Sequence, residues 1–142
     1  MESRGRHHKI FPARMSALPQ VAAFAAEVCL AAGLAKDARL RIAVLVEELF
    51  TNTVRHGHGR DSEEPVRLAF DVEPGRIGLT YEDTAPPHDP FVDVAAPDAA
   101  AAVEERPVGG LGVLLVTSMA RDVEYRRAGG RNRFSLVIPA PG

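Results

Sequence analysis

Two polar side chains on one expected helix have the types and the spacing that phosphate chemistry needs. Glu48 and Asn52 are four positions apart, so they project from the same side of a helix, beside its apolar face. The amide oxygen of Asn52 is a type of ligand that Mg²⁺ accepts, and the carboxylate of Glu48 could take a proton from a hydroxyl group or a water. Spacing alone also fits, and by itself favours, a solvated helix flank with two ordinary polar residues.

A second group of polar residues follows an expected strand, in the segment Tyr81–Pro90. Asp83 comes at the end of that strand, where its carboxylate could accept a hydrogen bond from an exocyclic amine such as that of adenine. The prolines that follow stiffen the turn, because the proline ring fixes the φ angle. The same residues also fit a proline-rich connection with a turn that begins at an aspartate, so this segment alone does not decide for a binding site.

A third segment, Val108–Leu115, places Gly109, Gly110 and Gly112 at the start of an expected helix. Glycines at this position let the backbone approach a phosphate, and the N–H groups of the helix N-terminus stabilise its negative charge. The segment lacks the Lys-Ser/Thr pair of a Walker loop, and it does not follow a strand as the dinucleotide fingerprint does. A flexible hinge explains the glycines equally well when they are taken alone.

The remaining sequence predicts the elements that would hold these segments in place. Helical periodicity covers residues 16–33 and 37–56. The expected helix ends are Ser16 and Asp37 as N-caps, Pro19 in a first turn, and Gly33 as a C-terminal stop. Expected strands span 7–11, 65–72, 77–81, 123–127 and 131–138, with further helices near 94–104 and over 111–119 in and after a long loop. Because consecutive strands are joined by short turns, the sheet should be largely antiparallel, with helices on one face.

Composition and charge exclude several classes of protein. The chain has 142 residues, 46% of them apolar and 25% charged, which indicates one ordinary globular domain. A net charge of −2 gives no strong field toward nucleic acid or an anionic membrane, and no apolar run is long enough to span a bilayer, so we expect a cytoplasmic protein. The single cysteine, Cys29, should be a buried, inert thiol. The histidine pairs 7–8 and 56/58 lack cysteine or acidic companions, which argues against a structural metal.

Together and in this order, the three segments resemble the ATPase superfamily of gyrase, heat-shock chaperones, histidine kinases and mismatch-repair proteins, also called the GHKL type. Within it, the chain looks most like the small anti-sigma-factor serine/threonine kinases. Their Glu-x-x-x-Asn-x-x-x-His-Gly pattern is met from Glu48 to Gly57, and their Asp-x-Gly-x-Pro-Phe-Asp-Pro loop is similar to Asp83–Pro90. The glycine-rich segment and the closing hairpin also look like the family's, so the likeness covers nearly the whole chain after the first dozen residues.

The resemblance implies the histidine-kinase-like ATPase fold, an α/β (α+β) two-layer sandwich with a mixed, mostly antiparallel sheet and helices on one face. It implies one domain over residues 1–142 that binds ATP with Mg²⁺ under a lid formed by residues 91–108. Asn52 would bind the metal, Glu48 would activate a target serine as the catalytic base, and Asp83 would contact the adenine amine. The nucleotide-binding residues that it implies are Asn52, Arg55, His56, Asp83, Ala85, Pro87, Gly109, Gly110, Leu111, Gly112 and Val113.

The same resemblance implies a function in gene regulation. A serine/threonine kinase of this family acts as an anti-sigma regulatory factor: it phosphorylates an anti-anti-sigma partner of the STAS type and sequesters a sigma factor. A homodimer is also implied, and no direct contact with nucleic acid or membrane is expected. A detached catalytic domain of a sensor histidine kinase fits less well, since the chain has no room for a dimerising helical hairpin with a phosphoacceptor histidine.

Two positions depart from the family pattern. Ala85 stands where glycine is usual, and His88 stands where phenylalanine is usual. If the backbone at position 85 needed a positive φ, alanine would be strained there, and its methyl group would narrow the space beside the base. These departures leave open an alternative: a non-catalytic nucleotide-binding or partner-switching module that sequesters a regulatory protein.

Overall fold

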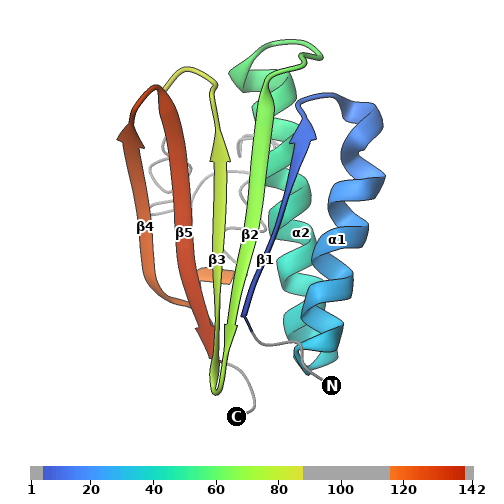
Figure 1. The fold of residues 1–142 in the computed structure, drawn as a ribbon, viewed down its shortest axis with the longest axis vertical. Coiled ribbons are helices and arrows are strands. Elements are labelled where there is room, and N and C mark those ends of the chain that lie inside the picture. Colours follow the sequence, from blue (N-terminus) through green and yellow to red (C-terminus); the bar gives the residue numbers. More distant parts are fainter. Residues whose placement is uncertain (1–4, 88–115, 140–142) are drawn as a thin grey trace, which may run out of the picture.

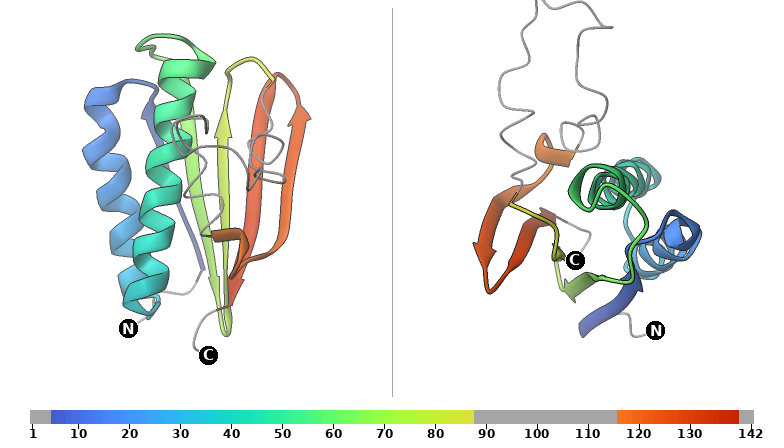
Figure 2. Two further views of the ribbon diagram at one scale, coloured as in Figure 1. Left: turned by 180° about the vertical axis from the view of Figure 1, so that it is seen from behind. Right: turned by 90° about the horizontal axis from the view of Figure 1, so that it is seen from above.

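The computed structural model describes residues 5–87 and 116–139, which form a sheet with two helices packed on one of its faces (Figure 1). The elements are β1 (Gly5–Pro12), α1 (Leu18–Ala31), α2 (Lys36–Asn52), β2 (Pro65–Glu73), β3 (Arg76–Asp83), β4 (Arg121–Ala128) and β5 (Arg131–Pro139). Seen from behind and from above, α1 and α2 lie side by side on the same face, and no described helix covers the opposite face (Figure 2). The expected two-layer sandwich is confirmed.

The five strands form one sheet in the order β1-β2-β3-β5-β4. Every pairing among these strands is antiparallel, so the described sheet is antiparallel throughout rather than mixed. The tight turn between β4 and β5 contains Gly129 and Gly130, with φ angles of 60° and 75°. Two adjacent positive φ values match the turn type that fits the twist of a two-residue hairpin, and the predicted closing hairpin is confirmed.

Helix α1 has no side-chain cap at its start and ends in backbone hydrogen bonds around a glycine. Pro19 lies in its first turn, as predicted. Ser16 does not cap the helix: it belongs to a 3₁₀ turn, Met15–Ala17, and α1 has no side-chain cap. At the other end, Gly33 has a φ of 82°, its N–H donates to Leu30 O, and the N–H of residue 34 donates to the carbonyl of residue 29. This pair of bonds is the Schellman motif, so the predicted stop is confirmed.

Helix α2 carries the apolar face on which the core is built. Its buried residues are the ones that the helical periodicity singled out: Ile42, Leu45, Val46, Leu49 and Phe50. Asp37 is not the N-cap. It lies in the first helical turn, where its carboxylate pairs with Arg41 at 2.9 Å, and the N-cap position is occupied by Ala35. The helix also ends earlier than expected, at Asn52, and the chain continues as a π-helical turn, Thr53–Gly57.

The inner face of the sheet completes this core. Alternate residues of β3 (Ile77, Leu79, Tyr81) and of β5 (Phe134, Leu136, Ile138) are buried against the helical layer. Cys29 is buried as predicted, and this burial raises the pKa of its thiol from 9.0 to about 12, against an opposing effect of nearby Arg39.

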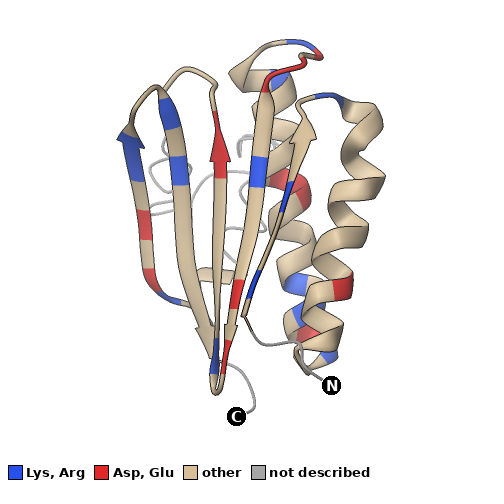
Figure 3. Ribbon diagram, viewed as in Figure 1, with Lys and Arg blue, Asp and Glu red and all other residues tan. Residues whose placement is uncertain are grey.

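Charged residues lie near the end of the sheet where β3 finishes and the β4–β5 hairpin turns (Figure 3). Glu82 of β3 pairs with Arg133 at 3.1 Å and lies 3.7 Å from Arg131, both on β5. The neighbouring positions on the inner face, Asp83 and Asn132, also pair across these two strands. Ion pairs on the outer face and the Asp83–Asn132 pairing on the inner face therefore join β3 to β5 at this end of the sheet. The candidate site lies on the inner face of the same end.

Candidate functional site

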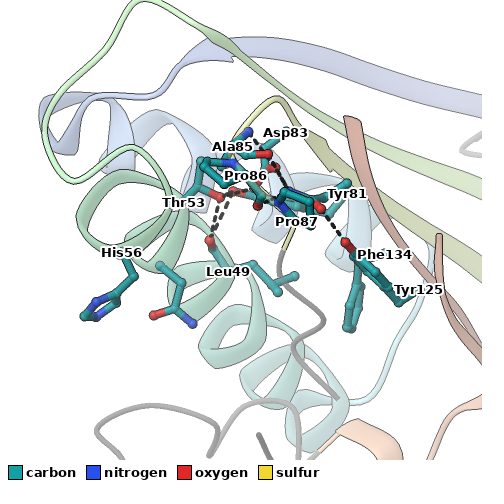
Figure 4. Close-up of a pocket in the computed structure, with 13 residues that line it drawn as sticks. Leu49, Thr53, His56, Tyr81, Asp83, Ala85, Pro86, Pro87, Tyr125 and Phe134 are labelled. Carbon is teal, nitrogen blue, oxygen red and sulfur yellow. Dashed lines mark hydrogen bonds between the residues drawn. The ribbon is translucent and has the colours of Figure 1, made fainter. Parts of the chain in front are cut away.

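A cavity of about 180 Å³ lies between the C-terminal end of α2 and the adjoining ends of the sheet (Figure 4). Its walls come from α2 with its π-helical turn, from the end of β3 with the loop that follows, and from the β4–β5 hairpin. The lining residues are Leu49, Asn52, Thr53, His56, Gly57, Tyr81, Asp83, Ala85, Pro86, Pro87, Tyr125, Asn132 and Phe134.

The π-helical turn shapes one wall of the cavity. The N–H of His58 donates to Thr53 O at 2.8 Å, five positions back rather than four. This wider turn extends the line of α2 by one more turn before the chain leaves it. Single π-turns inside or at the end of α-helices are frequent at functional sites. Thr53 and Gly57, at the two ends of the turn, both line the cavity.

Asp83 is the centre of a buried polar network. In the described parts of the chain, the buried polar or charged side chains are Thr53, Asp83 and Asn132, with 3%, 9% and 8% of their surface exposed. The other two are both bonded to Asp83. Thr53 Oγ1 lies 2.7 Å from Asp83 Oδ2, and Asn132 Nδ2 donates to Asp83 Oδ1 at 2.8 Å. The backbone N–H of Ala85 also donates to Oδ1, at 3.2 Å. A buried carboxylate needs such partners, since burial without them is costly.

Tyr81 extends the network by one further side chain, through its contact with Thr53. Its hydroxyl lies 2.6 Å from Thr53 Oγ1 and 3.2 Å from the carbonyl oxygen of Leu49. Burial raises the pKa of Tyr81 well above its ordinary value of 10.0; the hydrogen bond with Thr53 opposes this shift, and the charge of Asp83 adds to it. The phenol therefore stays protonated and remains available as a donor.

Asn132 connects the β4–β5 hairpin to the loop after β3. Besides Asp83, its Nδ2 donates to the carbonyl oxygens of Ala85 and Pro86, each at 3.0 Å. Its Oδ1 accepts a hydrogen bond from the hydroxyl of Tyr125. Arg127 adds a further bond to Ala85 O at 2.6 Å. The loop that forms the mouth of the cavity is thus held by side chains from both strands of the hairpin.

Ala85 fits this loop without backbone strain. Among the described residues, Asp122 is the one non-glycine residue with a positive φ, so position 85 does not need glycine for its conformation. The methyl group of Ala85 instead lies against Gly57: a Cβ added at Gly57 would be 2.6 Å from Ala85 Cβ. The strain that a positive φ would cause at position 85 is therefore absent. The narrowing of the space beside a bound base stays a prediction.

The structure brings together five of the residues expected to contact a nucleotide. Asn52, His56, Asp83, Ala85 and Pro87 all line the cavity. In Figure 4, His56 lies apart from the hydrogen-bonded group around Asp83.

Other expected site residues lie elsewhere. Glu48 is half-buried one helical turn before Asn52, and it does not line the cavity; Arg55 is exposed and does not line it either. His88, the lid at 91–108 and the glycine-rich residues Gly109, Gly110, Leu111, Gly112 and Val113 lie outside the described residues. The expectations for these positions stay predictions.

Sequence reasoning gave no site role to several residues that line the cavity together with Asp83. These are Thr53, Tyr81, Tyr125, Asn132 and Phe134. One sign was present for Asn132: it stands at an inward-facing position of a strand whose other inward residues, Phe134, Leu136 and Ile138, are apolar. A polar residue on the buried face of a strand needs a partner, and that requirement could have drawn attention to it.

The described residues contain no group of three or more His, Cys, Asp or Glu side chains placed to hold a metal ion. Within the same residues, no helix is long and apolar enough to cross a membrane.

The chain is a two-layer α/β sandwich with a cavity at one end of its sheet. It belongs to the family of histidine kinase-like ATPase domains, since the family's sequence profile matches residues 11–138. No curated protein matches the chain significantly.

A solved structure shares the fold. It is the crystal structure of the RsbU and RsbW domains of Rv1364c from Mycobacterium tuberculosis, with a TM-score of 0.61 and 16% sequence identity over 96% of this chain. The alignment covers 33% of that chain, so the present chain spans about a third of its length. At this level of identity the likeness shows the fold alone.

Proposed function

We propose that this chain binds ATP with Mg²⁺ and acts as a serine/threonine protein kinase, as an anti-sigma regulatory factor that phosphorylates an anti-anti-sigma partner. The observation that supports this most is the meeting of Asn52 and Asp83 at one cavity. These two residues stand 31 positions apart in the sequence, and they are the ones that the family motifs assign to the metal and to the adenine.

The cavity suits a base rather than a whole nucleotide. Its volume of about 180 Å³ is below the roughly 300–1,000 Å³ of pockets that enclose a drug-sized ligand. Apolar side chains from Leu49, Ala85 and Phe134 line it, and the Asp83 carboxylate supplies an acceptor for an exocyclic amine. The ribose and phosphates would then extend toward Asn52 and His56. The glycines at 109, 110 and 112 and the lid at 91–108 remain part of this proposal.

Asn52 has the chemistry that a Mg²⁺ site in such a protein requires. Mg²⁺ keeps several waters and usually takes one or two protein oxygens together with substrate phosphates, so a single amide oxygen is enough. When bound, the ion would neutralise charge on the phosphates during transfer. The position of Asn52 at the end of α2, on a rigid element, suits this role.

Glu48 would act as the base. It stands one turn before Asn52 on the same side of α2, outside the cavity wall, where a protein substrate could reach it. In the reaction, a serine oxygen of the partner attacks the γ-phosphorus and the bond to the bridging oxygen of ADP breaks. The serine proton passes to the Glu48 carboxylate, and ADP leaves with the electron pair.

A phosphotransfer assay tests this role, with a purified STAS-type anti-anti-sigma protein and radiolabelled ATP. Glu48→Gln should lower the transfer rate by about 100-fold or more while ATP affinity changes little. Its matched control is Glu47→Gln, because Glu47 is the exposed neighbour on the same helix and should be dispensable. Equal transfer by the Glu48→Gln variant would remove Glu48 as the base.

The alternative function is a module that binds a partner without catalysis. The position of Glu48 outside the cavity lining is the observation that favours it. In this case the protein would form a stable complex with the partner, and no phosphoserine would appear on the partner after incubation with ATP and Mg²⁺.

A further inference from the structure

Two relays of hydrogen bonds end on the same carboxylate, from opposite sides of the cavity. One comes from the helical layer and β3, through Tyr81 and Thr53. The other comes from the β4–β5 hairpin, through Tyr125 and Asn132. Each relay starts at a tyrosine hydroxyl and reaches Asp83 through one intermediate side chain. Figure 4 shows Thr53 and Tyr81 of the first relay beside Asp83.

The direction of the first relay follows from the available protons. Thr53 has one hydroxyl proton for three neighbours: Asp83 Oδ2 at 2.7 Å, the Tyr81 oxygen at 2.6 Å, and Leu49 O at 3.0 Å. Leu49 O already accepts the backbone N–H of Thr53. The carboxylate can only accept, so Thr53 donates to Asp83 and accepts from Tyr81. A phenol that stays protonated is suited to the start of such a relay.

The second relay also runs toward Asp83. The amide nitrogen of Asn132 faces three acceptors, which are Asp83 Oδ1, Ala85 O and Pro86 O. Its oxygen faces a donor, the Tyr125 hydroxyl. Turning the amide over would place an oxygen against the carboxylate and against two carbonyl groups. The surroundings therefore fix one orientation, in which Asn132 donates to Asp83.

Both relays leave Asp83 as a hydrogen-bond acceptor for a ligand. Its described partners are all donors: Oδ1 accepts from Asn132 and from Ala85 N, and Oδ2 accepts from Thr53. Oδ2 thus has acceptor capacity left, and Asp83 lines the cavity. Hydrogen bonds to both oxygens also restrict the rotation of the carboxylate. A ligand atom that donates is stabilised there, and one that accepts meets an oxygen that cannot donate.

We propose that Thr53 and Asn132 are positioning residues that hold Asp83 as a fixed hydrogen-bond acceptor, so that the cavity selects a 6-amino purine over a 6-oxo purine. This inference rests on the proposed nucleotide function and deepens it: the selectivity comes from the two relays as well as from Asp83 itself. A 6-oxo purine would bring no donor to the Asp83 carboxylate, and the lost hydrogen bond would lower the affinity for that base.

Thr53→Val is the cleanest variant for the test. Valine keeps the shape of threonine, and Tyr81 keeps an acceptor at Leu49 O, so the specific loss is the bond to Asp83 Oδ2. Thr53→Ser restores the hydroxyl. Thr51→Val is the matched control, two positions earlier in the last turn of α2, because Thr51 does not line the cavity.

The test measures affinities by calorimetry for ATP and for ITP, its 6-oxo analogue, with thermal melts to show that each variant is folded. The wild-type protein should prefer ATP. Thr53→Val should weaken ATP binding by about tenfold and leave ITP binding within about twofold, so the preference shrinks. Thr53→Ser should recover it, and Tyr125→Phe, at the far end of the second relay, should show a smaller loss.

Two different failures can be told apart. If the wild-type protein binds neither nucleotide, the nucleotide assignment itself is wrong, and this inference with it. If it binds both without preferring ATP, nucleotide binding stands and the selectivity inferred here is wrong. If the wild-type protein prefers ATP and Thr53→Val retains the same ratio of affinities, whether or not both fall together, the relay does not position Asp83 and only this inference is overturned.

Discussion

Gly57 and Ala85 approach each other so closely that only one of them can carry a side-chain carbon. A Cβ added at Gly57 would lie 2.6 Å from Ala85 Cβ, closer than such atoms pack in proteins. The contact joins the π-helical turn after α2 to the loop after β3, and both segments line the cavity. A side-chain carbon at position 57 would therefore force one of these two walls to shift.

Replacing Gly57 with alanine should destabilise the protein through this contact. Position 57 has no positive φ, so the penalty is steric rather than conformational, and overpacking of this kind costs roughly 1–3 kcal/mol. Urea unfolding measures it. Gly78→Ala is the control, since a Cβ there meets Asp71 Cβ at an ordinary 3.7 Å. In the Ala85→Gly background the Gly57→Ala cost should largely vanish; an undiminished cost would show that another contact causes it.

The single cysteine should be unreactive in the folded protein. Burial raises the pKa of Cys29 to about 12, so the thiolate that reacts with disulfide reagents is scarce near pH 8. Labelling with such a reagent should proceed only as fast as the chain unfolds, and quickly in urea. Because the folded pKa is the higher one, this thiol adds stability below about pH 9, and the contribution is lost as the pH rises toward 12. Rapid labelling under native conditions would contradict the burial.

Tyr81 should not ionise while the protein is folded. Its pKa is raised well above 10.0, chiefly by burial. The chain has two tyrosines, so in the Tyr125→Phe variant Tyr81 is the sole source of phenolate absorbance. On raising the pH, that absorbance should appear together with the loss of circular dichroism, since the protonated phenol stabilises the fold at lower pH and this contribution disappears as the pH climbs. Phenolate absorbance ahead of unfolding would contradict this account.

The parts of the fold that the sequence predicted are those that depend on local periodicity. The apolar spacing from Ile42 to Phe50 and the alternation along the strands each mark one buried face, and these faces define the sandwich. The helix caps were predicted less well. Asp37 is a residue type that often caps helices, yet its carboxylate pairs with Arg41 instead. This pairing depends on a side chain one helical turn away, which a cap pattern does not consider.

In the candidate site, too, the sequence predicted the residues that belong to local motifs and did not predict the others. Asn52 and Asp83 were recognised because each belongs to a motif of neighbouring residues. The residues that hold Asp83 were not, because Thr53 is 30 positions from it and Asn132 is 49 positions from it. These hydrogen bonds exist only once the turn after α2 has packed against β3 and the sheet has paired β3 with β5, and no local pattern reveals them. The absence of strain at Ala85 likewise became visible only with its backbone angles.

In the proposed function, one cavity joins Asn52 as a ligand of Mg²⁺ to Asp83 as the residue that binds the base. Calorimetric titration of ATP, with Mg²⁺ and then with EDTA, into the wild-type protein and the Asn52→Ala variant tests it most directly. Binding should depend on Mg²⁺ and weaken at least about tenfold in the variant, because the metal loses a ligand. No binding by the wild-type protein, or an affinity of the Asn52→Ala variant equal to that of the wild-type protein in the presence of Mg²⁺, would contradict this assignment.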